Sequence, residues 1–380
     1  MRINIIGGGP AGLYAAILLK RTRADLQITV FEQNPPDATF GFGVVFSDQA
    51  LGFLAEDDPE TAALALPIMR RWADIVVNHG VERIVIDGVG FAGVGRLELI
   101  QLLQRRATEL GVDLRHNVAI DTLEDLPPSD LVIAADGLNS LVRTSAAEAF
   151  GEKIQTLGNH FVWYGVAREF DALTQSFVET PVGRMNAHHY TYAAGRATFI
   201  IEMDSETFAR SGFAGMAEPA YRAKCEEYFK AYLGGQPLIP NNSHWRQFPV
   251  LTCATWHHGN QVLVGDALHT AHFSIGSGTR LALEDVISLV RALRAHDWQV
   301  EAALPAYQAA RAPVLRTITQ AALASAQWYE GFARHMDLDP WPFALSYIRR
   351  AGRLPPDRLR AMAPAFAGAL EQRGIALEAS

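Results

Sequence analysis

A glycine-rich turn close to the N-terminus constrains the fold of this chain more than any other feature. The segment Gly7–Gly12 has the sequence GGGPAG, follows the short apolar run Arg2–Ile6 and precedes a helix-compatible segment, 13–23. A second apolar run, Gln27–Phe31, then ends at Glu32. Strand, glycine turn, helix and strand in this order form a βαβ unit, because parallel strands need a crossover connection between them. The chain is therefore predicted to build a parallel sheet with helices on its faces.

The spacing of these glycines also predicts a ligand. Gly7-x-Gly9-x-x-Gly12 allows a tight turn, a close approach of the backbone to a pyrophosphate, and close packing of helix on strand. The helix N-terminus offers free N–H groups to the phosphates. Glu32, 20 residues after Gly12, is placed to accept hydrogen bonds from ribose hydroxyls. We expect a dinucleotide, NAD or FAD, to be held here by Gly7, Gly9, Pro10, Ala11, Gly12, Glu32 and Gln33.

The rest of the chain alternates between two kinds of pattern. Residues 96–110 have helical apolar spacing, and 131–135 is a fully apolar run typical of a strand buried on both faces. In 160–203, short aromatic and β-branched runs are separated by glycine or proline, which indicates an antiparallel sheet. From Leu281 the chain is mainly helical and rich in alanine. We therefore predict an α/β fold: a Rossmann-type domain interrupted by an antiparallel-sheet domain, with a helical C-terminal region.

Composition excludes several classes of partner. The chain carries 33 basic and 41 acidic residues, a net charge of −8, whereas proteins that bind nucleic acid or anionic membranes usually carry a positive charge. Two cysteines, Cys225 and Cys253, form neither a disulfide framework nor a metal site. The apolar N-terminus lacks the features of a signal peptide, and no stretch is long and apolar enough to span a bilayer. We expect a cytoplasmic protein without a bound metal.

Two further segments distinguish FAD from NAD as the expected dinucleotide. Residues 134–143, AADGLNSLVR, resemble the DG motif of flavoprotein monooxygenases, and residues 262–269, VLVGDALH, resemble their GD motif. Together with the first glycine motif, and in this order, they resemble the single-component FAD-dependent aromatic hydroxylases over essentially residues 1–300. The resemblance implies that Asp136, Gly265 and Asp266 contact FAD.

A narrower resemblance rests on two departures from the family's usual GD segment and on two further matching segments. Most members continue the GD motif with a proline and later an asparagine, but here Phe273 and Thr279 stand in those places. Together with 41–47, GFGVVFS, and 256–260, WHHGN, this variant resembles the branch that hydroxylates aryl-CoA thioesters such as salicylyl-CoA and anthraniloyl-CoA. Many relatives also have an arginine near Val45 for the flavin pyrophosphate. None occurs there, so we expect Arg96 to replace it.

The resemblance implies a reaction. NADH or NADPH docks transiently and reduces the FAD, which with O2 hydroxylates an aromatic ring through a C4a-hydroperoxyflavin; 5-hydroxylation of salicylyl-CoA to gentisyl-CoA would be one case. The alternatives are hydroxylation of a free phenolic acid or of an indole intermediate derived from tryptophan. Residues 1–75, 96–155 and 256–300 would form the FAD-binding domain. Residues 76–95 and 156–255 would form the substrate domain, and 301–380 the helical region, in a monomer or homodimer.

Candidate site residues divide into two groups. Gly276, Gly278 and Thr279 begin a helix whose N-terminus would stabilise negative charge on the reduced flavin ring, and Val45 would lie beside it. The substrate pocket would come mainly from the antiparallel sheet. Its expected members are Trp163, Tyr164, Tyr190 and Phe273, with His188 and His272 as substrate contacts or bases. The CoA phosphates would need cations, and Arg168, Arg184, Arg196, Arg210 and Arg246 are the arginines of this domain that we considered.

Overall fold

The predicted βαβ unit forms the centre of the first sheet. A computed structural model describes residues 1–39 and 41–378, and here β1 (Arg2–Ile6), α1 (Pro10–Thr22) and β2 (Gln27–Glu32) follow one another. Pro10 occupies the first turn of α1, where its missing N–H costs nothing. The sheet has six strands in the order β16-β17-β9-β1-β2-β8, parallel except for β16. Its other strands are β8 (Asp113–His116), β9 (Leu131–Ala134), β16 (His257–His258) and β17 (Gln261–Leu263).

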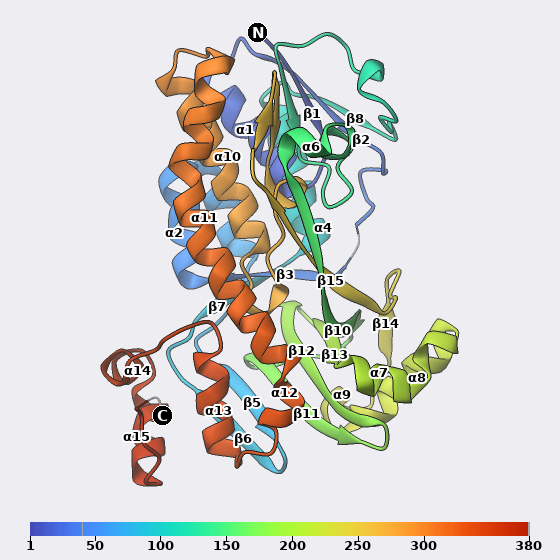
Figure 1. The fold of residues 1–380 in the computed structure, drawn as a ribbon, viewed down its shortest axis with the longest axis vertical. Coiled ribbons are helices and arrows are strands. Elements are labelled where there is room, and N and C mark those ends of the chain that lie inside the picture. Colours follow the sequence, from blue (N-terminus) through green and yellow to red (C-terminus); the bar gives the residue numbers. More distant parts are fainter. Residues whose placement is uncertain (40, 379–380) are drawn as a thin grey trace.

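Helices cover this sheet through their apolar stripes. In α4 (Arg96–Glu109), Leu99, Leu102 and Leu103 are buried, as their spacing predicts. Both α4 and α10 (Gly278–Ala295) pack against α1, and α11 (Val300–Glu330) packs against α10. Figure 1 shows α11 running from the first sheet down to the second. The remaining helices near this sheet are α2 (Asp48–Asp57), α3 (Pro59–Ala65), α5 (Leu141–Ser145) and α6 (Ala147–Phe150).

The second sheet is mainly antiparallel, as expected. This sheet has eight strands. Seven follow the order β14-β10-β13-β12-β11-β5-β6, and the eighth, β15, pairs with β10; only the β11–β5 pair is parallel. The central strands are β10 (Glu152–Val166), β11 (Leu173–Thr180), β12 (Gly183–Ala193) and β13 (Arg196–Met203). The outer strands are β5 (Ile75–His79), β6 (Glu82–Ile86), β14 (Leu238–Pro240) and β15 (Arg246–Cys253).

The two faces of this sheet bury different elements. One face packs against the end of α11 and against α13 (Pro340–Arg349) and α15 (Pro364–Gln372), in a core that includes Tyr190 and Tyr329. The other face packs under α8 (Glu218–Tyr228) and α9 (Lys230–Leu233). Short helices complete the chain: α7 (Ser205–Ser211), α12 (Phe332–His335) and α14 (Pro356–Met362).

A third, small sheet lies between these two. It orders β3 (Gly43–Ser47), β7 (Phe91–Gly95) and β4 (Arg70–Trp72), all antiparallel. Of the residues expected to be substrate-domain strands, 76–95, β5 and β6 join the second sheet but β7 joins this small one. The architecture confirms the predicted fold class, whereas the exact domain limits stay a prediction. In the described part of the chain, the helices are too short or too polar to cross a membrane.

Candidate active site

The first glycine turn has the shape that a pyrophosphate needs. Gly7 has a φ of +102°, and a Cβ there would overlap the carbonyl oxygen of Ala135. A Cβ at Gly12 would overlap the carbonyl oxygen of Gly7, because α1 packs closely on the turn. At Gly9, by contrast, a Cβ would meet nothing within 4 Å. Since the backbone is bare and open only at Gly9, this is the point where an anionic group can approach the helix N-terminus.

The DG motif lies directly beside this turn. A Cβ on Gly7 would come within 2.9 Å of the Asp136 Cα. Oδ2 of Asp136 accepts a hydrogen bond from the N–H of Leu141 at 2.8 Å, but its Oδ1 is buried without a partner in the described structure. Burial raises the pKa of this carboxyl. An unpaired buried oxygen is costly, so this oxygen is a candidate to accept a hydrogen bond from a bound ligand.

Glu32 lies on the other side of the turn. Its Oε2 accepts from the N–H of Gly8 at 2.7 Å, and its Oε1 accepts from the N–H of Asn34 at 2.8 Å. The carboxylate therefore stands at the end of β2 against the glycine turn, and Gln33 follows it as an exposed residue. This is the position from which an acid reaches ribose hydroxyls in dinucleotide sites.

The GD motif touches the same turn from a third direction. Gly265 has a φ of +59°, and a Cβ there would lie 3.3 Å from the Cβ of Ala11 and 3.1 Å from that of Ala282. The next residue, Asp266, is exposed to solvent although burial among protein atoms raises its pKa. A residue that is exposed to solvent and yet surrounded by protein atoms lies on the wall of a cleft. Burial lowers the pKa of the Arg96 guanidinium, and the nearby Asp266 and Tyr190 oppose this shift.

A buried ionic cluster supports the GD turn from behind. Asp285 of α10 accepts from the N–H of Gly265 at 3.1 Å, from Nε2 of His269 at 2.7 Å and from Nε of Arg311 at 2.9 Å. Although burial acts to raise it, the pKa of Asp285 lies below its ordinary value because of His269 and Arg311. His269 and Asp285 therefore brace the turn together, and the partnership of Asp285 with Arg311 was not evident from the sequence.

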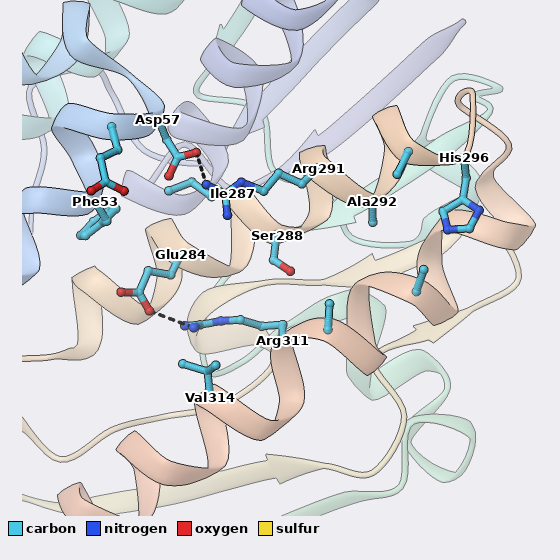
Figure 2. A pocket seen from close by; sticks show the side chains of 14 residues that line it. Phe53, Asp57, Glu284, Ile287, Ser288, Arg291, Ala292, His296, Arg311 and Val314 are labelled. Carbon is cyan, nitrogen blue, oxygen red and sulfur yellow. Dashed lines mark hydrogen bonds and ion pairs between the residues drawn. The ribbon is translucent and has the colours of Figure 1, made fainter.

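Arg311 also lines a groove on the outer face of the helices. Figure 2 shows this cavity of about 560 Å³ between α2, α10 and α11, with Glu284 paired to Arg311 and Asp57 paired to Arg291. Four of the charged residues in the lining are thus paired with one another, whereas Glu56, which also lines the groove, forms no ion pair within the described residues. None of the predicted site residues lines the groove, so the groove is not part of the candidate site.

The start of α10 completes the cofactor side. Gly276 has a φ of +61° and lies against Val45 of β3, since a Cβ there would come within 2.9 Å of a Val45 methyl group. Helix α10 begins at Gly278, with Thr279 in its first turn. The positive end of an 18-residue helix therefore points towards the region between Val45 and the GD turn, where it favours negative charge.

An aromatic group on one face of the second sheet lies beyond this helix end. Strand pairing puts Phe161, Trp163 and His188 on a common face, because Trp163 and His188 both pair with Ile200. The ring of Phe273 lies 4.9 Å from that of Phe161, 5.3 Å from His188 and 6.3 Å from Trp163. The indole N–H of Trp163 is buried and has no acceptor among the described residues. It is available to an oxygen atom of a substrate.

Two residues at this face were not identified by the sequence analysis: Glu202, on the sheet itself, and Tyr329, on the helix packed against it. Glu202 is buried; one of its oxygens lies 3.0 Å from Nε2 of His188, and the other accepts from Nδ2 of Asn159 at 2.9 Å. Tyr329, at the end of α11, packs against the His188 ring at 4.8 Å. A single charge in the apolar run 197–203 was a signal for Glu202. Nothing local in the sequence marks Tyr329.

Burial sets the ionisation of these groups. It lowers the pKa of His188 to about 3 and that of His272 to about 4, so both rings are neutral near pH 7. It raises the pKa of Glu202, an effect that His272 and Asn159 oppose. His272 lies at the edge of the group, where its Nδ1 is 2.9 Å from the hydroxyl of Ser274 and its ring is 4.2 Å from that of Phe273.

The structure separates the two predicted tyrosines. Tyr190 lies on the same face as His188 and donates to the carbonyl of Gly43 at 2.8 Å. Tyr164 pairs with Phe199 on the opposite face and donates to Glu218 at 3.2 Å, under α8. It is therefore not brought together with the other pocket residues. A one-residue step along a strand reverses the face, which is why Trp163 joins the group and Tyr164 does not.

Comparison with known proteins identifies the class. A model of the FAD binding domain matches residues 128–322, and a model of the NAD(P)-binding Rossmann-like domain matches 5–36. Together with the geometry above, these matches define a FAD-dependent monooxygenase. Among solved structures, 2-methyl-3-hydroxypyridine-5-carboxylic acid oxygenase shares the fold with a TM-score of 0.70 at 21% identity, over 94% of this chain and 97% of that one.

Relatives in sequence narrow the class to a family. The chain is 39% identical to a salicyloyl-CoA 5-hydroxylase of a Streptomyces species over 361 residues, which is 92% of this chain and 70% of that one. It is 36% identical to a 5-monooxygenase from Streptosporangium sibiricum that acts on 3-hydroxy-4-methyl-anthranilyl bound to an aryl-carrier protein, over 87% of this chain and 89% of that one. The chain belongs to the FAD-dependent aromatic hydroxylases and uses NAD(P)H as co-substrate.

The described residues fit FAD. The backbone over Gly9 is open, the Oδ1 of Asp136 is buried without a partner, and the charge of Arg96 faces the interior. These features come from three separate segments, the first and last of them 127 residues apart, and each suits a group that a dinucleotide carries: phosphates, hydroxyls or a polar ring edge. The individual contacts of the residues predicted to hold FAD remain a proposal.

Proposed function

We propose that this enzyme hydroxylates an aromatic ring that is carried as a thioester, such as salicylyl-CoA, with gentisyl-CoA as the product, or anthraniloyl-CoA. The names of the two relatives support this choice, because one acts on an aryl-CoA and the other on an aryl group bound to a carrier protein. In both kinds of substrate the carboxyl group of the aromatic acid is esterified to sulfur and is uncharged.

The observation that carries the proposal is the acidic character of the sheet face that bears Phe161, Trp163 and His188, which we call the ring-binding face. Glu202 is buried there, and Arg350, a cation whose charge reaches His188, already donates to the carbonyls of Ser274 and Tyr347. A free aryl carboxylate would bring a second acid beside Glu202, and like charges 4 Å apart in a partly buried site repel each other by about 4 kcal/mol, a cost that Arg350 would offset only in part. A thioester carbonyl avoids this cost and can accept from the indole of Trp163.

The residues of this chain would bind and orient rather than transform the substrate. Bound FAD supplies the hydride and oxygen chemistry. Phe273, Phe161 and Trp163 would hold the ring and exclude water from it. His188, neutral and fixed through Nε2 by Glu202, would accept a hydrogen bond from a ring hydroxyl at Nδ1, which raises the electron density of the ring. His272 would line the edge of the same pocket.

The test is turnover on a matched panel of substrates. Salicylyl-CoA, anthraniloyl-CoA and the two free acids are added to the FAD-loaded enzyme with NADH or NADPH, and mass spectrometry follows the addition of one oxygen atom. We expect a thioester to stimulate NAD(P)H oxidation and to gain oxygen. Glu202→Gln should reduce the preference for the thioester over free salicylate. Stimulation by free salicylate or an indole compound alone would overturn the proposal.

We also propose a cytoplasmic location and a monomeric or homodimeric state. Cys225 and Cys253 are free thiols, as is usual in a reducing compartment. Light scattering on the purified enzyme measures the oligomeric state, and a tetramer would contradict this part of the proposal.

A further inference from the structure

A second cavity adjoins the ring-binding face. It has a volume of about 190 Å³ and lies between β15, the loop that follows the GD turn, and α11. In Figure 1, α11 runs from the upper to the lower part of the molecule, and β15 lies beside β10, with which it pairs. Its lining includes Val250, Thr252, Thr270, His272, Thr319 and Ala326. None of the residues expected to bind FAD lines this cavity, so it is not part of the predicted cofactor site.

The loop between the two walls is fixed by hydrogen bonds. The Thr270 hydroxyl donates to the carbonyl of Pro249 at 2.6 Å and accepts from the N–H of Leu251 at 2.9 Å. This holds the loop on β15 and leaves the space towards α11 open. The inner end of the cavity is His272, whose ring lies 4.9 Å from Phe248 and 4.2 Å from Phe273. The cavity therefore ends where the aromatic group begins.

The lining suits a neutral chain that contains amides. Thr252, Thr319 and Gln320 supply neutral hydrogen-bonding groups, while Val250 and Ala326 belong to the apolar part of the wall. Lys, Arg, Asp and Glu are missing from the lining as the described residues define it. A pyrophosphate or a carboxylate would be desolvated here without a partner, which is costly. An uncharged diamide chain would find both hydrogen bonds and apolar contacts.

Two cations lie on or beside the elements that wall the cavity. Lys153 pairs with Thr252 in the β10–β15 ladder, so its side chain leaves the same face of the sheet. Arg316 precedes Thr319 and Gln320 by three and four residues on α11, so it shares their side of the helix. Both are exposed, and neither forms an ion pair within the described chain.

The arginines considered from the sequence are less suitable. Arg184 pairs with Glu179 and Asp337, Arg168 donates to the carbonyl of Tyr232, and Arg210 donates to that of Val182. None of the five arginines considered from the sequence lines the cavity.

We propose that this cavity binds the pantetheine arm of an aryl thioester, with the ring inside the aromatic group and the terminal phosphate between Lys153 and Arg316. The inference rests on the proposed function. It places the thioester end near His272 and leaves the rest of the carrier outside the protein. CoA and the prosthetic group of a carrier protein present the same phosphopantetheine chemistry, so either source fits.

The first experiment fills the cavity. Thr252→Trp and Thr319→Trp are made as separate variants, so that the test does not depend on the folding of one of them. The control is Thr317→Trp, at an exposed position of α11 outside the lining. Dissociation constants come from the change in FAD absorbance when salicylyl-CoA or its N-acetylcysteamine analogue, which lacks most of the arm, is added to the oxidised holoenzyme. We expect either filled variant to weaken salicylyl-CoA binding about tenfold or more, the loss of one fully buried side-chain contact. The short analogue and the Thr317→Trp control should change less than about twofold.

The second experiment tests the phosphate end. Lys153→Glu/Arg316→Glu is compared with Lys230→Glu/Arg294→Glu, which changes the net charge equally at two exposed positions elsewhere. At low salt we expect the first pair to weaken salicylyl-CoA binding about fivefold or more and to leave the short analogue unchanged. In a parallel titration, acyl carrier protein loaded with a salicylyl group replaces salicylyl-CoA. The ligand with the lower dissociation constant identifies the source of the phosphopantetheine arm.

The outcomes separate this inference from the proposed function. If the wild-type enzyme binds no aryl thioester of any length, the proposed function fails. If it binds salicylyl-CoA but both filled variants bind it equally well, the proposed function stands and the cavity is not the passage. A loss of NADH affinity in the filled variants, with salicylyl-CoA binding retained, would assign the cavity to the nicotinamide co-substrate instead.

Discussion

Substitution of Gly9 separates the needs of the fold from those of the cofactor. Gly9 has a φ of −76° and a ψ of −178°, which alanine adopts without strain, and its Cβ would meet nothing within 4 Å. Replacement of glycine by alanine at such a position restricts the unfolded chain. We therefore expect Gly9→Ala to leave the unfolding free energy of the FAD-free protein unchanged or to raise it by about 0.4–1 kcal/mol.

The same methyl group should interfere with FAD. It would occupy the open space over the turn and push a pyrophosphate away from the free N–H groups of α1. Loss of two hydrogen bonds to a charged group, each worth about 1.5 kcal/mol, amounts to about 3 kcal/mol or about 100-fold in Kd. Urea unfolding of the apoprotein and fluorescence titration with FAD measure the two effects separately.

Gly7→Ala is the matched control. With a φ of +102° and a Cβ that would overlap the carbonyl of Ala135, this variant should lose at least about 2 kcal/mol of apoprotein stability as well as FAD affinity. If Gly9→Ala binds FAD as tightly as the wild type, or if it destabilises the apoprotein as much as Gly7→Ala does, then the glycine turn is not the pyrophosphate site.

Three further predictions follow from buried groups. Asp285→Asn should cost about 3 kcal/mol in urea unfolding because it leaves the buried Arg311 poorly paired, and Asp285→Asn/Arg311→Met should recover at least half of this loss; a purely additive pair would contradict the argument. His188 has a folded pKa of about 3 against an ordinary value of 6.5, so the unfolded chain binds the extra proton and stability falls as the pH drops from about 6.5 towards 3. His188→Gln should remove up to about 1.4 kcal/mol per pH unit from this slope, measured by unfolding at several pH values. Tyr164→Phe should leave kcat/KM within about twofold, whereas Tyr190→Phe, which loses the bond to Gly43, should lower it about fivefold; equal effects would contradict the assignment of the two tyrosines to opposite faces.

The cofactor side could be predicted from the sequence because its constraints are local. A positive φ at Gly7 and Gly265, and a strand ending in Asp136, are properties of short segments. Glycine is needed wherever the backbone must turn this way or approach a neighbour closely, so the letters of the motif carry the geometry directly. The fold class therefore followed from a few dozen residues, and the family resemblance of the three motifs implied the use of FAD with NAD(P)H.

The substrate side depended on tertiary structure. Trp163 and Tyr164 are neighbours of similar chemistry, yet only strand pairing decides that the first shares a face with His188. The partner of His188, Glu202, comes from the adjacent strand, and Tyr329 comes from a helix more than 100 residues later. Contacts between distant segments leave no periodic trace in either segment, because each side chain is compatible with many partners until the chain is folded.

The same contrast holds behind the GD turn. The sequence by itself determined that Gly265 and Asp266 follow a buried strand, and the family resemblance predicted that they contact FAD. Only the folded chain brought Asp285 of α10 and Arg311 of α11 together beneath them. A backbone turn is specified by the residues that form it, whereas a buried charge is specified by whichever distant group neutralises it, and that choice exists only once the helices have packed.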